Sequence, residues 1–126
     1  MNRLIVAVDD SRTVRASVKY TLTKDGYEVE MAGNGQEGLE LLSKLNSEGK
    51  KPAMIISDIN MPVMDGITFI RKAKSDISYK FIPILVLTTE SQEQKKMEGK
   101  KAGAAGWLVK PFEPEQLLMV VKKFVK

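Results

Sequence analysis

Met54-Ile55-Ile56-Ser57-Asp58-Ile59-Asn60-Met61-Pro62 is an apolar run that meets an aspartate and is then ended by a proline. Residues 53–57 have the length and the branched side chains of a buried strand, so we expect Asp58 to stand at the end of that strand. Burying a carboxylate costs free energy unless a cation or hydrogen bonds compensate for the lost water. The stretch therefore predicts that Asp58 is either turned toward water or held in place for chemistry.

Short apolar runs alternate with amphipathic segments along the rest of the chain. The runs are typical of strands and cover residues 4–8, 27–31, 53–57, 82–87 and 107–109. Helices are expected to begin near Ser11, Asn34, Ile67, Ser91 and Pro114. Parallel strands need crossover connections, which place helices on both faces of the sheet. We therefore predict an α/β fold, a doubly wound five-stranded parallel sheet with five helices, in which the polar and apolar alternation of residues 27–31 marks an edge strand.

Two of the helix starts carry residues that can cap them. Asp10 or Ser11 can cap the first helix, and Asn34 with Glu37 three residues later has the spacing of a capping box. Both positions therefore predict a defined helix start.

The segment 92–101 differs from the other helical segments. Ser91 and Gln94 offer another capping arrangement, but the segment is almost wholly polar and Met97 is its lone large apolar residue. Few anchors predict a weakly packed helix, and both a mobile element and an ordinary surface helix fit this pattern.

Length and composition limit the chemistry that the chain can carry out. The sequence has 126 residues, 43% of them hydrophobic and 29% charged, which suits one globular domain, residues 1–126, without an output domain. There is no cysteine and no histidine. This excludes disulfides, thiolate chemistry, the usual general base, the usual zinc ligand and an internal phosphohistidine.

The start of the chain and its charge suggest a location and a class of partner. The first apolar run soon meets Asp9 and Asp10, so it is too short for a signal peptide or a membrane span, and we expect a cytoplasmic protein with no membrane partner. The formal net charge is +4, but the lysines are scattered and have little aromatic interleaving, so we expect no nucleic-acid binding. Solvated helix faces and attraction to an acidic protein partner both remain open.

Polar side chains follow the predicted strands at the points where they end. They are Asp9 and Asp10, Asp58, Thr88 with Thr89, and Lys110. Because the carboxyl ends of parallel strands share one edge, where ligands bind, we expect these side chains to converge there. Converging carboxylates repel one another unless a cation neutralises them, and oxygen ligands without histidine or cysteine favour Mg²⁺ over zinc.

The same set of side chains suits phosphoryl transfer. Lys110 would supply positive charge and the Thr88 hydroxyl a hydrogen-bond donor for a phosphoryl group, and Asp58 could act as nucleophile to form an aspartyl phosphate. Taken singly, each residue has a simpler interpretation: Asp9 or Asp10 as a helix cap, Thr88 as a strand residue, Lys110 as a solvated lysine. Only their convergence at one edge favours chemistry.

At this point the sequence resembles response-regulator receiver domains, above all the single-domain chemotaxis members of the CheY type. The resemblance covers almost the whole chain and is carried by Val8-Asp9-Asp10-Ser11, Asp58-Ile59-Asn60-Met61-Pro62, Met64-Asp65-Gly66, Leu87-Thr88-Thr89-Glu90 and Lys110-Pro111-Phe112. It implies the flavodoxin-like strand order 2-1-3-4-5 and a cis peptide bond before Pro111.

The resemblance also implies roles for single residues. Asp58 resembles the phosphoacceptor; Asp10, Asp58 and the backbone carbonyl of Asn60 would bind the metal directly, and Asp9 partly through water. Thr88 resembles the switch hydroxyl and Lys110 the lysine that pairs with the phosphoryl group. Trp107 stands where many relatives carry a tyrosine or phenylalanine that swings inward on activation, and tryptophan is bulkier.

The function implied is a phosphorylation-activated signalling switch rather than an enzyme, because the chain would catalyse only its own phosphorylation and dephosphorylation. A separate histidine kinase would donate the phosphoryl group, and the partner expected for a monomeric chemotaxis member is the flagellar motor switch protein or a phosphatase.

Other functions fit the residues less fully. A single-domain phosphorelay intermediate, which passes the phosphoryl group to a histidine phosphotransfer protein, remains open. A magnesium-dependent phosphohydrolase of the haloacid dehalogenase type would need a second acid where this chain has Asn60, and a DNA-binding regulator would need a further domain.

Overall fold

The computed structural model describes residues 2–125, in which strands and helices alternate strictly. The strands are β1 (Leu4–Val8), β2 (Glu28–Ala32), β3 (Met54–Ser57), β4 (Ile84–Thr88) and β5 (Gly106–Val109). The helices are α1 (Arg12–Lys24), α2 (Gly35–Ser47), α3 (Gly66–Lys74), α4 (Glu93–Ala102) and α5 (Pro114–Phe124). No helix in this part of the chain combines the length and the apolar character needed to cross a bilayer.

The strands form one parallel sheet in the order β2-β1-β3-β4-β5. This confirms the predicted fold class and strand order, and β2 is an edge strand as its alternating pattern predicted. The predicted bounds differ by one or two residues: β2 extends to Ala32, and β4 begins only after Pro83, which lacks the N–H that a ladder needs.

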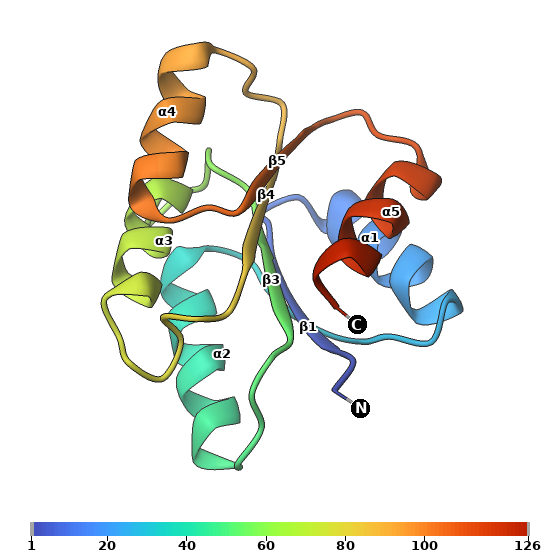
Figure 1. Ribbon diagram of the computed structural model, residues 1–126, viewed down its shortest axis with the longest axis vertical. Coiled ribbons are helices and arrows are strands. Elements are labelled where there is room, and N and C mark those ends of the chain that lie inside the picture. The colour runs from blue at the N-terminus through green and yellow to red at the C-terminus, as the bar shows by residue number, and fades with distance from the viewer. Residues whose placement is uncertain (1, 126) are drawn as a thin grey trace.

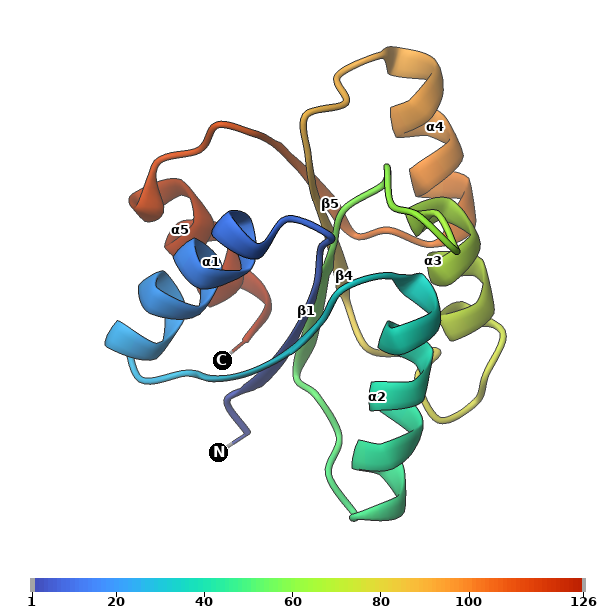
Figure 2. The ribbon, with the colours of Figure 1, turned by 180° about the vertical axis from the view of Figure 1, so that it is seen from behind.

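The helices cover both faces of the sheet. In Figures 1 and 2, α1 and α5 lie on one side of the strands and α2, α3 and α4 on the other. Alternate residues of β1 enter the two cores: Val6 and Val8 pack under α2 and α3, whereas Ile5 and Ala7 pack under α1 and α5. Burial of the central strands on both faces explains their continuous apolar sequences.

Side-chain caps fix three of the helix starts. Ser11 rather than Asp10 caps α1, Asn34 caps α2, and Asp65 caps α3. Glu37 bonds the N–H of Gly33 instead of the Asn34 N–H, so the predicted capping box at α2 is only half formed.

The predicted cap of α4 is wrong. Gln92, not Ser91, occupies the cap position and makes no capping hydrogen bond through its side chain. Met97, the expected apolar anchor, is 57% exposed, and the buried residues of this helix are Gly99 and Ala102. The helix α4 therefore packs through small residues, which lie too close to the backbone to show as an apolar stripe in the sequence.

Candidate functional site

The sheet brings the predicted strand-end residues to one edge. Val8 pairs with Ser57 in the β1–β3 ladder, so Asp9 and Asp58 follow the same rung on neighbouring strands. Thr88 pairs with Val109 in the β4–β5 ladder, which places Lys110 one residue beyond the end of β4. The ladder register thus accounts for the convergence expected from the sequence.

Lys110 bridges two of the carboxylates. Its Nζ lies 2.8 Å from Asp9 Oδ2 and 3.1 Å from Asp58 Oδ2. The three side chains are between 6% and 11% exposed, so these ion pairs are largely shielded from water. The Lys110–Pro111 peptide bond is cis, as the resemblance implied.

Backbone amides hold the same carboxylates. Asp58 Oδ1 accepts a hydrogen bond from the N–H of Ile59 at 2.6 Å, and Asp9 Oδ1 accepts one from Ser11 at 2.9 Å. The loop after β3 also folds back so tightly that a Cβ atom at Gly66 would overlap the carbonyl oxygen of Asp58. Asp58 is therefore held by its own turn as well as by Lys110.

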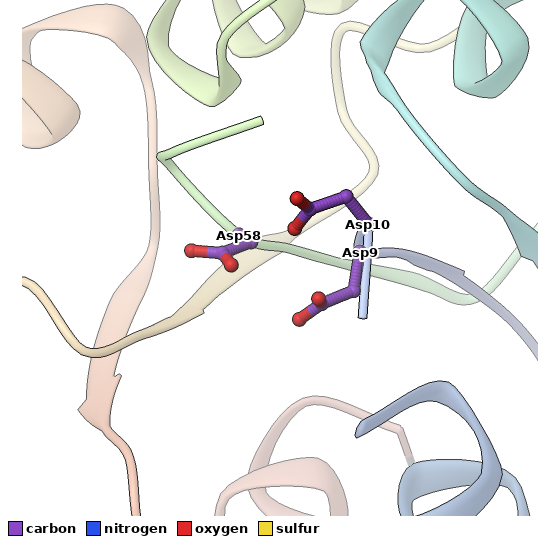
Figure 3. Close-up of side chains that lie close together, drawn as sticks. All are labelled: Asp9, Asp10 and Asp58. Carbon is purple, nitrogen blue, oxygen red and sulfur yellow. The ribbon is translucent and has the colours of Figure 1, made fainter. Parts of the chain in front are cut away.

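Asp10 completes a cluster of three carboxylates. One carboxylate oxygen from each of Asp9, Asp10 and Asp58 lies within 4.8 Å of the others. Figure 3 shows Asp9 and Asp10 side by side at the end of β1, with Asp58 beside them at the end of β3. Asp10 is exposed, and its side chain makes no hydrogen bond or ion pair with residues 2–125.

The charges of this cluster do not balance. Burial raises the pKa of Asp9 above its ordinary value of 3.8, despite the opposing effect of the Lys110 ammonium, and the Asp58 charge adds to the rise. Burial alone would lower the pKa of Lys110, but Asp9 and Asp58 outweigh it, so the net change is upward from 10.5. One lysine thus stands beside three converging carboxylates, which leaves an excess of acidic groups at this edge.

The donor set fits a hard divalent cation. All three side chains offer carboxylate oxygens, and cations such as Mg²⁺ prefer oxygen ligands. The open position of Asp10 suits Mg²⁺, which keeps several of its waters.

Thr88 and Trp107 lie beside this cluster rather than in it. Thr88 is fully buried, and its Oγ1 accepts the N–H of Glu90 at 3.3 Å. The half-buried indole of Trp107 donates its N–H to the Glu90 carbonyl at 2.9 Å. Neither side chain has a hydrogen bond to the aspartates within residues 2–125. Both instead make hydrogen bonds to the backbone of the loop between β4 and α4.

Sequence reasoning missed one residue that touches this edge. Arg15, in α1, donates from Nη1 to the backbone carbonyl oxygen of Asp9 at 2.6 Å. An arginine on an amphipathic helix is ordinarily a surface residue, and Asp9 lies before the helix begins, so no signal in the sequence indicated this contact.

Comparisons with known proteins agree with this fold. Residues 5–122 match the family described as the response regulator receiver domain. CheY1 of Helicobacter pylori is 37% identical over 90% of this chain and 89% of its own length. The response regulator MprA of Mycobacterium leprae is 36% identical over 97% of this chain, which spans 50% of that protein.

A solved structure is closer still in sequence. The chemotaxis protein CheY4 of Vibrio cholerae superimposes with a TM-score of 0.90 and 47% identity, covering 98% of this chain and 99% of that one. The family match over nearly the whole chain, the parallel sheet in the order 2-1-3-4-5 and the acidic cluster beside Lys110 agree with one another. This chain therefore belongs to the response regulator receiver domain family.

Proposed function

We propose that this protein is a phosphorylation-activated switch of a chemotaxis-type two-component pathway. In this proposal Asp58 accepts a phosphoryl group from a phosphohistidine on a separate histidine kinase. The observation that carries it is the placement of Asp58, which is buried at the carboxyl edge beside two further carboxylates. Its Oδ2 lies 3.1 Å from Lys110 Nζ. Buried carboxylates that converge beside a lysine are typical of functional sites.

The transfer is an in-line displacement at phosphorus. A carboxylate oxygen of Asp58 forms the new P–O bond while the P–N bond to the donor histidine breaks, and the imidazole leaves with the electron pair and takes up a proton. Lys110 stabilises the charge on the phosphoryl oxygens, and Thr88 supplies a hydroxyl to the phosphorylated state. Dephosphorylation by water completes a cycle in which the protein acts only on itself.

The metal of this proposal is Mg²⁺, held by Asp9, Asp10, Asp58 and the backbone carbonyl of Asn60. When bound, it would neutralise charge on the phosphoryl oxygens and on the carboxylates. The receiver domain of the sensor histidine kinase PA1611 from Pseudomonas aeruginosa, which shares the fold at 22% identity and a TM-score of 0.84, was solved with a magnesium ion in its active-site cleft.

The output of the switch is binding to a partner. A phosphoryl group adds a charge of about −1.5 to −2 and three strong acceptor oxygens. We expect it to draw Thr88 inward, to release the Glu90 loop that Trp107 holds, and to shift α4. The chemotaxis proteins among its relatives make the flagellar motor switch the leading target, approached by a cytoplasmic monomer.

A phosphorelay role is the second candidate. The sensor histidine kinase CheAY of Helicobacter pylori contains a segment 35% identical to 98% of this chain, which spans 15% of that protein. Receivers of this type thus also occur joined to a kinase, where a phosphoryl group could pass onward. Pull-downs with a motor-switch protein and with a histidine phosphotransfer domain, before and after phosphorylation, separate the two roles.

Intact-mass spectrometry with acetyl phosphate and Mg²⁺ tests the phosphoacceptor. The wild type should gain one phosphoryl group and Asp58→Asn none. Asp65→Asn is the matched control, because Asp65 is an exposed helix cap and asparagine caps equally well. An unmodified wild type, or an equal gain in Asp58→Asn, would overturn the proposal.

A further inference from the structure

Arg15 reaches from α1 back to the turn that carries the first two aspartates. Its Nη1 lies 2.6 Å from the backbone carbonyl oxygen of Asp9, and the side chain is half-buried. This carbonyl belongs to the peptide that joins Asp9 to Asp10. The guanidinium therefore holds the peptide from which the Asp10 side chain departs.

The same guanidinium lies against the loop that follows β2. A Cβ atom added to Gly33 would stand 3.5 Å from Arg15 Nη1 and 3.1 Å from Glu37 Oε1. Glu37 Oε1 also accepts the N–H of Gly33 at 3.0 Å. The guanidinium and this carboxylate thus approach the same glycine, which places Arg15 between the Asp9–Asp10 turn and the neighbouring β2–α2 loop.

The N–H and the carboxylate of Asp9 also have bonding partners. Its N–H donates to Ala32 at 3.1 Å, and its carboxylate binds Lys110 and the Ser11 amide. Asp10 has no such partner among the described residues. The direction of its carboxylate consequently depends on the backbone that Arg15 holds.

We propose that Arg15 is a positioning residue for the metal-binding turn: by holding the Asp9 carbonyl, it sets the direction in which Asp10 presents its carboxylate to Mg²⁺. The inference rests on the proposed function, because that function supplies the metal.

Positioning and plain electrostatics predict opposite results when Arg15 is removed. Loss of a positive charge beside three carboxylates should tighten the binding of a divalent cation. Loss of a positioning contact should weaken it, because Asp10 is then spread over several directions before the metal binds. The sign of the change in Mg²⁺ affinity therefore distinguishes the two.

Arg12 provides the matched control. It lies in the first turn of the same helix, is exposed, and makes no hydrogen bond or ion pair with residues 2–125. Arg12→Met removes the same charge near the same edge but leaves the Asp9 carbonyl bonded.

Isothermal titration calorimetry with MgCl₂ on the full chain is the test, with melting in EDTA to verify folding. We expect Arg15→Met to weaken Mg²⁺ binding about tenfold, which is the loss of roughly 1.4 kcal/mol. Arg15→Lys keeps the charge but loses the reach and planar fork of the guanidinium, so it should also weaken binding. Arg12→Met should bind Mg²⁺ as well as the wild type or better. Phosphorylation of Arg15→Met by acetyl phosphate should recover at saturating Mg²⁺, because the reacting groups are intact.

Two results would contradict the inference. If Arg15→Met and Arg15→Lys bind Mg²⁺ as tightly as Arg12→Met, Arg15 does not position the turn, and the proposed function is unaffected. If the wild type itself binds no Mg²⁺, the proposed metal site fails and the role of Arg15 fails with it.

Discussion

The indole N–H of Trp107 donates to the backbone carbonyl of Glu90 at 2.9 Å. Trp107 lies in the edge strand β5, and Glu90 belongs to the loop that leaves β4 directly after Thr88. A phenylalanine at this position could fill part of the space but could not make the bond. The tryptophan therefore joins the edge of the sheet to the loop expected to move on phosphorylation.

Replacing this tryptophan should loosen the loop without opening the core. Trp107→Phe removes the N–H and leaves the Glu90 carbonyl to water, so we expect a loss of about 1 kcal/mol in the free energy of unfolding, measured in urea. Hydrogen exchange should accelerate in residues 89–92. An equal acceleration of exchange across β1 and β3 would instead indicate general destabilisation. It would contradict a purely local effect of the Trp107–Glu90 hydrogen bond.

Gly99 sets how closely α4 approaches the indole. A Cβ atom at this position would lie 2.8 Å from Trp107 Cζ3, closer than such atoms pack. Gly99→Ala should therefore displace the indole and change its emission maximum and its quenching by acrylamide, even though alanine favours the helix by about 1 kcal/mol. Lys101→Ala, at an exposed position of the same helix, should leave the fluorescence unchanged. Identical spectra for both variants would show that α4 adjusts instead.

Most of the fold could be predicted because it depends on patterns that repeat along the chain. The continuous apolar runs, the caps at Ser11 and Asn34, and the alternation of strand and helix together identify a parallel sheet covered on both faces. Its shared carboxyl edge then identified the acids and Lys110 as neighbours. The strand order itself came from the family resemblance.

What could not be predicted depends on single contacts. The packing of Gly99 against Trp107 is invisible in sequence, because glycine adds nothing to an apolar stripe. The hydrogen bond from Arg15 to the Asp9 carbonyl depends on one rotamer of a long side chain. The cap at Ser91 was wrong because α4 begins two residues later, where its first turn lacks a capping side chain.

Val63 adopts a backbone conformation that glycine would adopt more easily. Its φ is 69°, and the N–H of Met64 bonds the carbonyl of Pro62 across it at 2.7 Å. A left-handed conformation costs a residue with a side chain roughly 1–2 kcal/mol, more than glycine loses in chain entropy. Val63→Gly should therefore raise the free energy of unfolding by about 0.5–1 kcal/mol. Ile77→Gly is the control, because Ile77 is similarly exposed but has no positive φ, and it should lose stability.

The raised pKa of Asp9 means that its ionised carboxylate destabilises the metal-free folded state. Burial holds the pKa above 3.8, the value taken for the unfolded chain, so the folded state binds the proton more tightly. Stability in EDTA should therefore fall as the pH rises from 3.8 through the pKa of the folded state, and ionised Asp9 then remains unfavourable up to neutral pH. Binding of Mg²⁺ to the folded state should restore stability.

Asp9→Asn should consequently raise the melting temperature in EDTA at pH 7, because it removes a buried charge. The single amide oxygen can still accept the hydrogen bond from the Ser11 N–H, and Lys110 keeps its ion pair with Asp58. Each kcal/mol gained corresponds to about 4 °C in a domain of this size. The stabilisation by Mg²⁺ should shrink in the variant, so the two melting curves approach each other as the metal is added. Asp76→Asn, an exposed loop position that likewise caps a backbone N–H, should follow the wild type in both conditions. A lower melting temperature for Asp9→Asn in EDTA would mean that the ion pair with Lys110 outweighs the burial of the carboxylate.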